Sequence, residues 1–196
     1  MKLLGRKTSG NVQKVMFLLE ELKMPYSRED YGRQFDNTQT PDYLGMNPNA
    51  KVPTLVDGSL VVWESNTILR YVAAKAKSPL YPADAAKRSH VERWMDWQLA
   101  ALNGPYLAMF REAKLEADKR SAEFGAQLKD LGAQLSILDK SMKSWVAGDE
   151  FRIADICLAP IVARCLRFGV ELPALPNVKR WDAAIGAREA FKKATA

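Results

Sequence analysis

The 196-residue sequence has few of the side chains that carry redox or metal chemistry: one histidine, His90, and two cysteines, Cys157 and Cys165. The cysteines lie eight residues apart in an apolar stretch, so no C-x-x-C pair is available for dithiol chemistry. One imidazole and two thiols are too few for a common zinc site, and we expect no metal. We interpret both cysteines as small buried residues and His90 as a solvated one.

Long apolar runs and blocks of one charge are also missing. No stretch approaches the roughly 18 apolar residues that a membrane span requires, and the segment after Met1 becomes polar too soon for a signal peptide. We therefore expect a cytoplasmic protein with no membrane partner. The net charge of +6 is spread without a basic block, which does not indicate nucleic-acid binding. A hydrophobic content of 47% indicates a globular chain.

The most informative segment places a proline at the start of a predicted strand. Pro53 stands near the beginning of an apolar run over residues 52–56. Because proline has no N–H to donate to a β-ladder, it is tolerated at the first residue of a strand or at an edge. The Val52–Pro53 bond can be cis at modest cost, and a cis bond would turn the Val52 carbonyl outward. The sequence thus predicts an exposed stretch of backbone at Val52.

A hairpin and a helix start follow directly. Asp57-Gly58 between two apolar runs predicts a tight turn, and the second run leads into Glu64-Ser65. Ser65 is predicted to be the N-cap of a helix over 66–76, and the free N–H groups and dipole of a helix start favour an anion. Together these features could bind both ends of a peptide-like ligand, although an ordinary hairpin followed by a capped helix explains them equally well.

Apolar spacing divides the chain into a mixed α/β part and a helical part. Before the hairpin it predicts three elements, at residues 3–4 (strand), 11–23 (helix) and 26–31 (strand). With the hairpin and its helix, the order is β-α-β and then β-β-α, which one mixed sheet with helices on its faces satisfies. A proline-containing segment after residue 77 is predicted to be a linker, and only helical patterns follow it.

In this order and spacing, the motifs resemble those of cytosolic glutathione transferases over the whole chain. The motifs are Asn47-Pro48 through Pro53, Glu64-Ser65, Gly148-Asp149 followed by Ile153-Ala154-Asp155-Ile156, and Thr8-Ser9-Gly10-Asn11-Val12, which is similar to the Ser/Thr-x-Asn motif of a prokaryotic branch. The resemblance implies a thioredoxin-like α/β domain that binds glutathione over 1–77, a linker at 78–84 and an all-α bundle over 85–196. It also implies a cytoplasmic homodimer that acts in detoxification.

The same resemblance assigns binding roles to individual residues. The backbone of Val52, presented by a cis Pro53, would pair with the cysteinyl part of glutathione in the manner of an added β-strand. Glu64 and Ser65 would hold the γ-glutamyl end of the tripeptide. Lys51 would meet its glycyl carboxylate.

The chemistry implied by the resemblance needs glutathione as a thiolate, because the thiolate is the nucleophile. Lowering an ordinary thiol pKa of about 8.5 by about two units takes roughly 2.7 kcal/mol of preferential interaction with the charged form. Ser9 and Asn11 are the expected hydroxyl and amide donors to the sulfur, with Thr8 as the alternative hydroxyl. Simple capping of the first helix would also explain both residues.

No charged cluster marks a particular second substrate, so we expect small hydrophobic electrophiles. Candidates for lining their site are Trp94, Asn103, Tyr106 and Phe110, and the resemblance implies that Asp96 reaches the γ-glutamyl amine bound by a partner subunit. Two other functions stay open. The bound thiolate could reduce disulfides or peroxides, since two glutathione molecules need no protein cysteine, or the fold could serve as a non-catalytic binding protein.

One position departs from the family pattern. The resemblance implies Ser or Thr three residues before Asp155, where the pair would form a capping box for the apolar helix predicted over 153–168. Here that position is Arg152, whose side chain has no acceptor. Either Asp149 or Asp155 rebuilds the cap alone, or this helix is less firmly specified.

Overall fold

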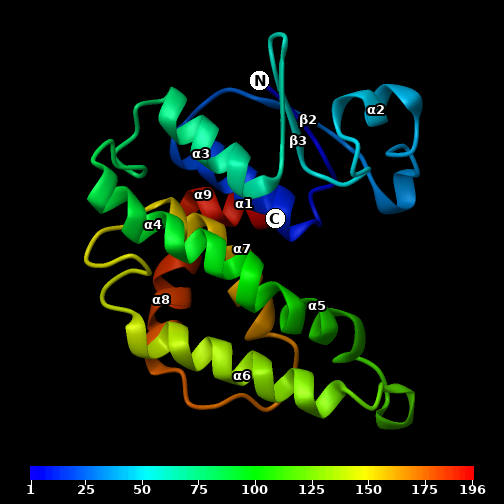
Figure 1. The fold of residues 1–196 in the computed structure, drawn as a ribbon, viewed down its shortest axis with the longest axis vertical. Helices are drawn as coiled ribbons and strands as arrows, with labels where there is room; N and C mark the ends of the chain where they lie inside the picture. Colours follow the sequence, from blue (N-terminus) through cyan, green and yellow to red (C-terminus); the bar gives the residue numbers. More distant parts are fainter. The chain divides into compact units, whose positions relative to one another are not determined.

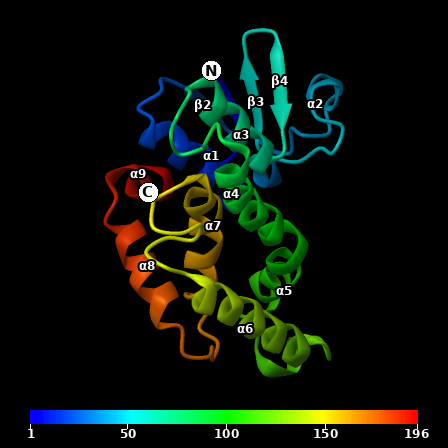
Figure 2. The same cartoon turned by 60° about the vertical axis from the view of Figure 1, so that its left-hand side comes forward.

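A computed structural model describes residues 1–196 and divides the chain into two compact units. The first consists of Met1–Tyr81 with Ala187–Ala196, and the second of Pro82–Gly186. The first unit is built on one four-stranded sheet in the order β2-β1-β3-β4. Its strands are β1 (Lys2–Leu4), β2 (Ser27–Glu29), β3 (Thr54–Asp57) and β4 (Leu60–Trp63). β1 pairs parallel with β2 and antiparallel with β3, which forms a hairpin with β4 (Figure 2).

Helices pack around this sheet because their apolar residues recur at helical spacing. The helices of the first unit are α1 (Gly10–Glu21), α2 (Pro41–Met46), α3 (Ser65–Lys75) and α9 (Glu189–Thr195), with a 3-10 turn at Arg33–Phe35. α1 packs against both α3 and α9 (Figure 1). Leu3, Leu55 and Leu69 are fully buried, so the core of this unit lies between the sheet and these helices.

The four strands, α1 and α3 follow the predicted β-α-β and β-β-α order, with α2 and α9 in addition, and the α/β thioredoxin-like fold class is confirmed. The predicted boundaries differ from the observed ones by one or two residues, and two of these differences bear on the site. The strand expected over 52–56 begins at Thr54, after the proline. Ser65, predicted to be an N-cap, is the first helical residue of α3, and Glu64 is the cap. Glu64 takes this position because the chain reverses from β4 into α3 there, with Glu64 at φ +67°.

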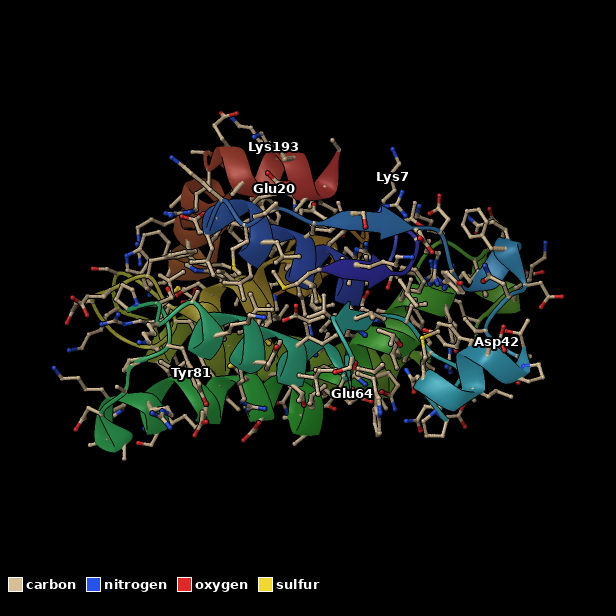
Figure 3. All side chains as sticks on the ribbon, turned by 90° about the horizontal axis from the view of Figure 1, so that it is seen from above. Lys7, Glu20, Asp42, Glu64, Tyr81 and Lys193 are labelled. Atoms are coloured by element: carbon tan, nitrogen blue, oxygen red, sulfur yellow. The ribbon has the colours of Figure 1, made fainter.

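The C-terminal helix α9 folds with the first unit, whereas the predicted domain boundary placed these residues in the region 85–196. Its Phe191 ring meets Phe17 of α1 edge to face, with ring centres 5.2 Å apart. Arg188 pairs with Glu21, and the Lys193 ammonium lies 3.6 Å from a carboxylate oxygen of Glu20 (Figure 3). An apolar contact flanked by two ion pairs therefore holds the end of the chain on α1.

The second unit is entirely helical, as predicted. Its elements are α4 (Ala85–Trp97), a π-helical turn (Gln98–Leu102), α5 (Asn103–Glu112), a 3-10 turn (Ala117–Lys119), α6 (Phe124–Ser141), α7 (Ile153–Cys165) and α8 (Pro176–Gly186). α7 is buried along almost its whole length and contacts α4, α5 and α8. No helix of the chain combines the length and the apolar character needed to cross a membrane.

Both cysteines lie in α7 and are buried, as the sequence predicted, and neither forms a disulfide. Burial raises the pKa of Cys165 to about 12, so this thiol is protonated at neutral pH. The Cys157 sulfur lies 3.8 Å from Oε1 of Gln98. His90 is exposed on α4, also as predicted. No protein thiol is therefore presented to solvent for nucleophilic chemistry.

Asp155 alone rebuilds the cap of α7 that Arg152 cannot supply. Its Oδ2 accepts a hydrogen bond of 2.9 Å from the Arg152 N–H, which is half of a capping box. Its Oδ1 accepts from the Val146 N–H at 2.9 Å and from the Trp181 indole N–H at 2.8 Å. Asp155 is fully buried, and this burial raises the pKa of its carboxyl group to about 6. The three hydrogen-bond donors act in the opposite direction, but their effect on the pKa is smaller. One side chain thus ties α7 to the preceding loop and to α8.

Candidate functional site

The Val52–Pro53 peptide bond is cis and lies just before β3, with Pro53 buried and Val52 partly exposed. Side chains of α2 and its C-cap hold the chain on both sides of this bond. Tyr43 Oη donates to the Lys51 carbonyl at 2.7 Å, and Asn47 Nδ2 donates to the same oxygen at 2.8 Å. Both side chains also hydrogen-bond Thr54 Oγ1, at 3.0 and 3.1 Å. The Val52 backbone is therefore rigidly presented.

Sequence reasoning missed the parts that Tyr43 and Asn47 play. Tyr43 is only 1% exposed and stacks on Tyr31, with ring centres 5.1 Å apart. Burial raises the pKa of Tyr43, so its hydroxyl stays protonated and can donate. Asn47 Oδ1 accepts from the Asn49 N–H at 3.1 Å, which makes an Asx-type turn. The signals in the sequence that could have indicated these roles are the aromatic Tyr43 and the turn-forming Asn47, which stand in an otherwise polar segment.

The start of α3 presents the predicted Glu64-Ser65 pair. Ser65 is 3% exposed, and Glu64 is exposed at the junction of β4 and α3 (Figure 3). Glu64 has φ +67° and ψ +117°, a conformation that costs a non-glycine residue roughly 1–3 kcal/mol and that is concentrated at functional sites. The Glu64 carbonyl accepts the first helical bond, from the Ile68 N–H at 2.9 Å. Lys51 is exposed beside Val52.

The predicted thiol donors lie at the start of α1. Ser9 is the N-cap, 8% exposed and in an extended conformation, but its side chain makes no capping hydrogen bond. Asn11 is exposed in the first turn, and Thr8 is exposed just before the cap. Side-chain capping therefore does not account for Ser9, whose hydroxyl is not engaged with the helix end.

Two contacts bring these segments together within the first unit. Gly5, between β1 and α1, is buried so closely that a Cβ there would lie 2.5 Å from Cγ2 of Val12 and 3.2 Å from Cβ of Val52. The start of α1 thus lies against Val52. On α1, Nζ of Lys14 donates to Oδ1 of Asn66 in α3 at 3.3 Å. The segments that carry Ser9, Val52 and Ser65 therefore all adjoin the N-terminal half of α1.

We expect Gly5→Ala to lower the free energy of unfolding by about 1–3 kcal/mol, because the added methyl group overpacks Val12 and Val52. It should also shift the amide NMR resonance of Val52. Urea unfolding and the amide spectrum measure the two effects. Gly45→Ala is the matched control, since nothing lies within 4 Å of a Cβ at this helical position, and it should stabilise by about 0.5–1 kcal/mol. Equal effects of the two variants would refute the close packing at Gly5.

The residues predicted to line the electrophile site lie in the second unit and differ in exposure. Tyr106 is 5% exposed and packs among other rings, so it is mainly a core residue. Phe110 is 38% exposed on the same helix, and its ring lies 5.9 Å from that of Tyr106 and 6.0 Å from the Arg164 guanidinium. Trp94 and Asn103 are partly exposed, and Asp96 is exposed on α4. In the whole chain no three His, Cys, Asp or Glu side chains gather as a metal site.

Comparison with known proteins identifies the family. The model for the N-terminal domain of glutathione S-transferases matches residues 1–74, and that for the C-terminal domain matches residues 99–189. The chain is 36% identical to glutathione S-transferase GstB of Escherichia coli K12, over 96% of this chain and 94% of that protein. It is 31% identical to the disulfide-bond oxidoreductase YghU of the same organism, over 93% and 70% of the two chains.

A solved structure agrees with this assignment. The theta class glutathione S-transferase of Xanthomonas axonopodis pv. citri, crystallised with glutathione bound, superimposes with a TM-score of 0.93 at 33% identity. The match covers 99% of this chain and 96% of that one. With both domain models matched in order and the sheet and helical bundle in place, the chain belongs to the glutathione S-transferase family.

Proposed function

We propose that this glutathione transferase binds glutathione along Val52, ionises its thiol beside Ser9 and transfers it to small hydrophobic electrophiles. The observation that carries this proposal is the convergence of three segments, bearing Ser9, Val52 and Ser65, around the N-terminal half of α1. The glutathione bound in the similar Xanthomonas structure supports the choice of ligand. The thiol releases its proton to water, and the thiolate forms a carbon–sulfur bond to the electrophile. In a substitution the leaving group departs with its bonding electron pair, and in an addition to a double bond the second carbon takes up a proton from water.

The tripeptide is bound through its backbone and its two charged ends. The rigid Val52 backbone pairs with the cysteinyl residue of glutathione as a short added strand. The free N–H groups and the dipole at the start of α3, next to Glu64 and Ser65, favour the γ-glutamyl carboxylate, while the Glu64 carboxylate attracts the γ-glutamyl amine. The exposed ammonium of Lys51 meets the glycyl carboxylate.

The thiol is ionised by donors rather than by a base. The Ser9 hydroxyl is free of capping and donates to the sulfur, assisted by the Asn11 amide and by the positive end of α1. Each of these interactions stabilises the thiolate over the thiol, which lowers the thiol pKa. Thr8, also exposed at this loop, is the alternative hydroxyl donor.

Calorimetry with glutathione, followed by a conjugation assay with an aryl halide, tests the function. We expect saturable binding and glutathione-dependent product formation, whereas S-methylglutathione should bind without reacting because its sulfur cannot ionise. Absence of binding at millimolar glutathione would refute the proposal and favour a non-catalytic binding protein.

Glutathione-dependent reduction of disulfides is the second candidate function. It is favoured by the similarity to a protein named as a disulfide-bond oxidoreductase. Because Cys157 and Cys165 are buried, two glutathione molecules would supply the two electrons and two protons and leave as glutathione disulfide. A mixed disulfide of glutathione, assayed beside the aryl halide, separates the two functions by relative kcat/KM.

We also propose that the protein acts as a cytoplasmic homodimer. Membership of the family supports this assembly, and Asp96 is the candidate for reaching the γ-glutamyl amine bound by the second subunit. Sedimentation equilibrium should give twice the 22.0 kDa mass of one chain.

A further inference from the structure

A lysine lies in the core of the first unit, on the helix that starts at the proposed thiol donor. Lys14 is fully buried in α1, five residues after Ser9, and is among the largest side chains that have no solvent exposure. Taking an ammonium group out of water is costly unless hydrogen bonds and opposite charge compensate for it. An apolar side chain of similar length would fill the same space without that cost, so packing does not explain a lysine here.

One polar contact of Lys14 reaches the start of α3. Its Nζ donates to Oδ1 of Asn66 at 3.3 Å, and Asn66 is only 2% exposed. Asn66 directly follows Ser65, in the first turn of α3. The contact thus connects the helix that begins at Ser9 with the turn that presents Glu64 and Ser65, across 52 residues of sequence.

We propose that Lys14 is a positioning residue of the glutathione site and that it acts through Asn66. This role rests on the proposed function, because it requires the start of α3 to hold the γ-glutamyl end of glutathione. By holding the Asn66 side chain, Lys14 fixes the first turn of α3 against α1.

The test compares three variants of the full chain: Lys14→Met, Asn66→Leu and the double variant. Each single change should weaken glutathione binding about 10-fold in calorimetry, equivalent to about 1.4 kcal/mol. The double variant should bind no more weakly than either single variant, because both changes remove the same contact. KM for glutathione should rise more than kcat falls, since the Ser9 and Asn11 donors are untouched.

Stability separates positioning from a merely structural role. Replacing a buried polar pair by apolar groups is often neutral or stabilising, so the double variant should fold with an unfolding midpoint at least equal to that of the wild type. It should nevertheless bind glutathione more weakly. Lys129→Met, at an exposed lysine of α6, is the control for the loss of one positive charge and should leave binding unchanged.

Three results would overturn the role of Lys14. Wild-type affinity in the double variant would make the contact structural only. Losses that add between Lys14→Met and Asn66→Leu would mean that Lys14 does not act through Asn66. Failure of the wild-type chain itself to bind glutathione would refute the proposed function as well. Calorimetry on the wild type, carried out first, identifies this outcome.

Discussion

Ser9→Ala is expected to raise the pKa of the bound glutathione thiol by about one to two units. A hydrogen bond to a charged group contributes about 1.5–3 kcal/mol, and each pKa unit corresponds to 1.36 kcal/mol. From a bound thiol pKa near 6.5, about two units below the ordinary 8.5, the thiolate fraction at pH 7 should fall about 3- to 25-fold. Because a more basic thiolate is also more nucleophilic, kcat/KM should fall less, by at most about 3-fold. Thiolate absorbance and kcat/KM, both recorded against pH, measure the two effects.

The pH profile distinguishes this role from a structural one. Activity of Ser9→Ala should recover at alkaline pH, where glutathione ionises without assistance. Since the Ser9 side chain makes no capping bond, the free energy of unfolding should change by less than the ~1 kcal/mol typical of a lost cap. Ser9→Thr keeps a hydroxyl and serves as the conservative control. If Thr8→Val shifts the thiol pKa and Ser9→Ala does not, the donor is Thr8.

Asp155→Ala is expected to lower the free energy of unfolding by about 3–5 kcal/mol, because it leaves three buried N–H donors without an acceptor. Asp155→Asn keeps one oxygen and the shape of the side chain, so its loss should be about half as large. Urea unfolding, followed by tryptophan fluorescence, measures both. Asp149→Asn is the control: Asp149 is exposed and only 3.4 Å from an exposed Lys143, so its change should be within about 0.5 kcal/mol.

The loss of unfolding free energy caused by Asp155→Ala should depend on pH. Burial raises the pKa of Asp155 to about 6, above the value near 3.9 of the unfolded chain. The stabilisation from this shift is therefore complete below pH 4 and is lost as the pH rises through 6. The difference in unfolding free energy between the wild type and Asp155→Ala should be larger at pH 4 than at pH 7. A difference that grows toward pH 7 would contradict the raised pKa.

Much of the architecture could be predicted because periodicity and turn chemistry are local properties. The apolar spacing after Ser9 identified α1, and Asp57-Gly58 located the β3–β4 turn. Local preference also produced the error at Ser65. Serine is the better N-cap residue, but the reversal from β4 into α3 required a positive φ one residue earlier, and Glu64 became the cap. The backbone conformation between β4 and α3, rather than the preference of serine for the N-cap, thus decided which residue caps α3.

The sequence by itself determined the element types, the α/β and helical halves, and the family, since these depend on neighbours along the chain. Only the tertiary structure decided which distant residues meet: Lys14 with Asn66, Gly5 with Val52, and Asp155 with Trp181. It likewise decided that the last helix packs on α1. The physical reason is that a short amphipathic helix or a buried polar side chain has many possible partners, and close packing of the whole unit selects among them.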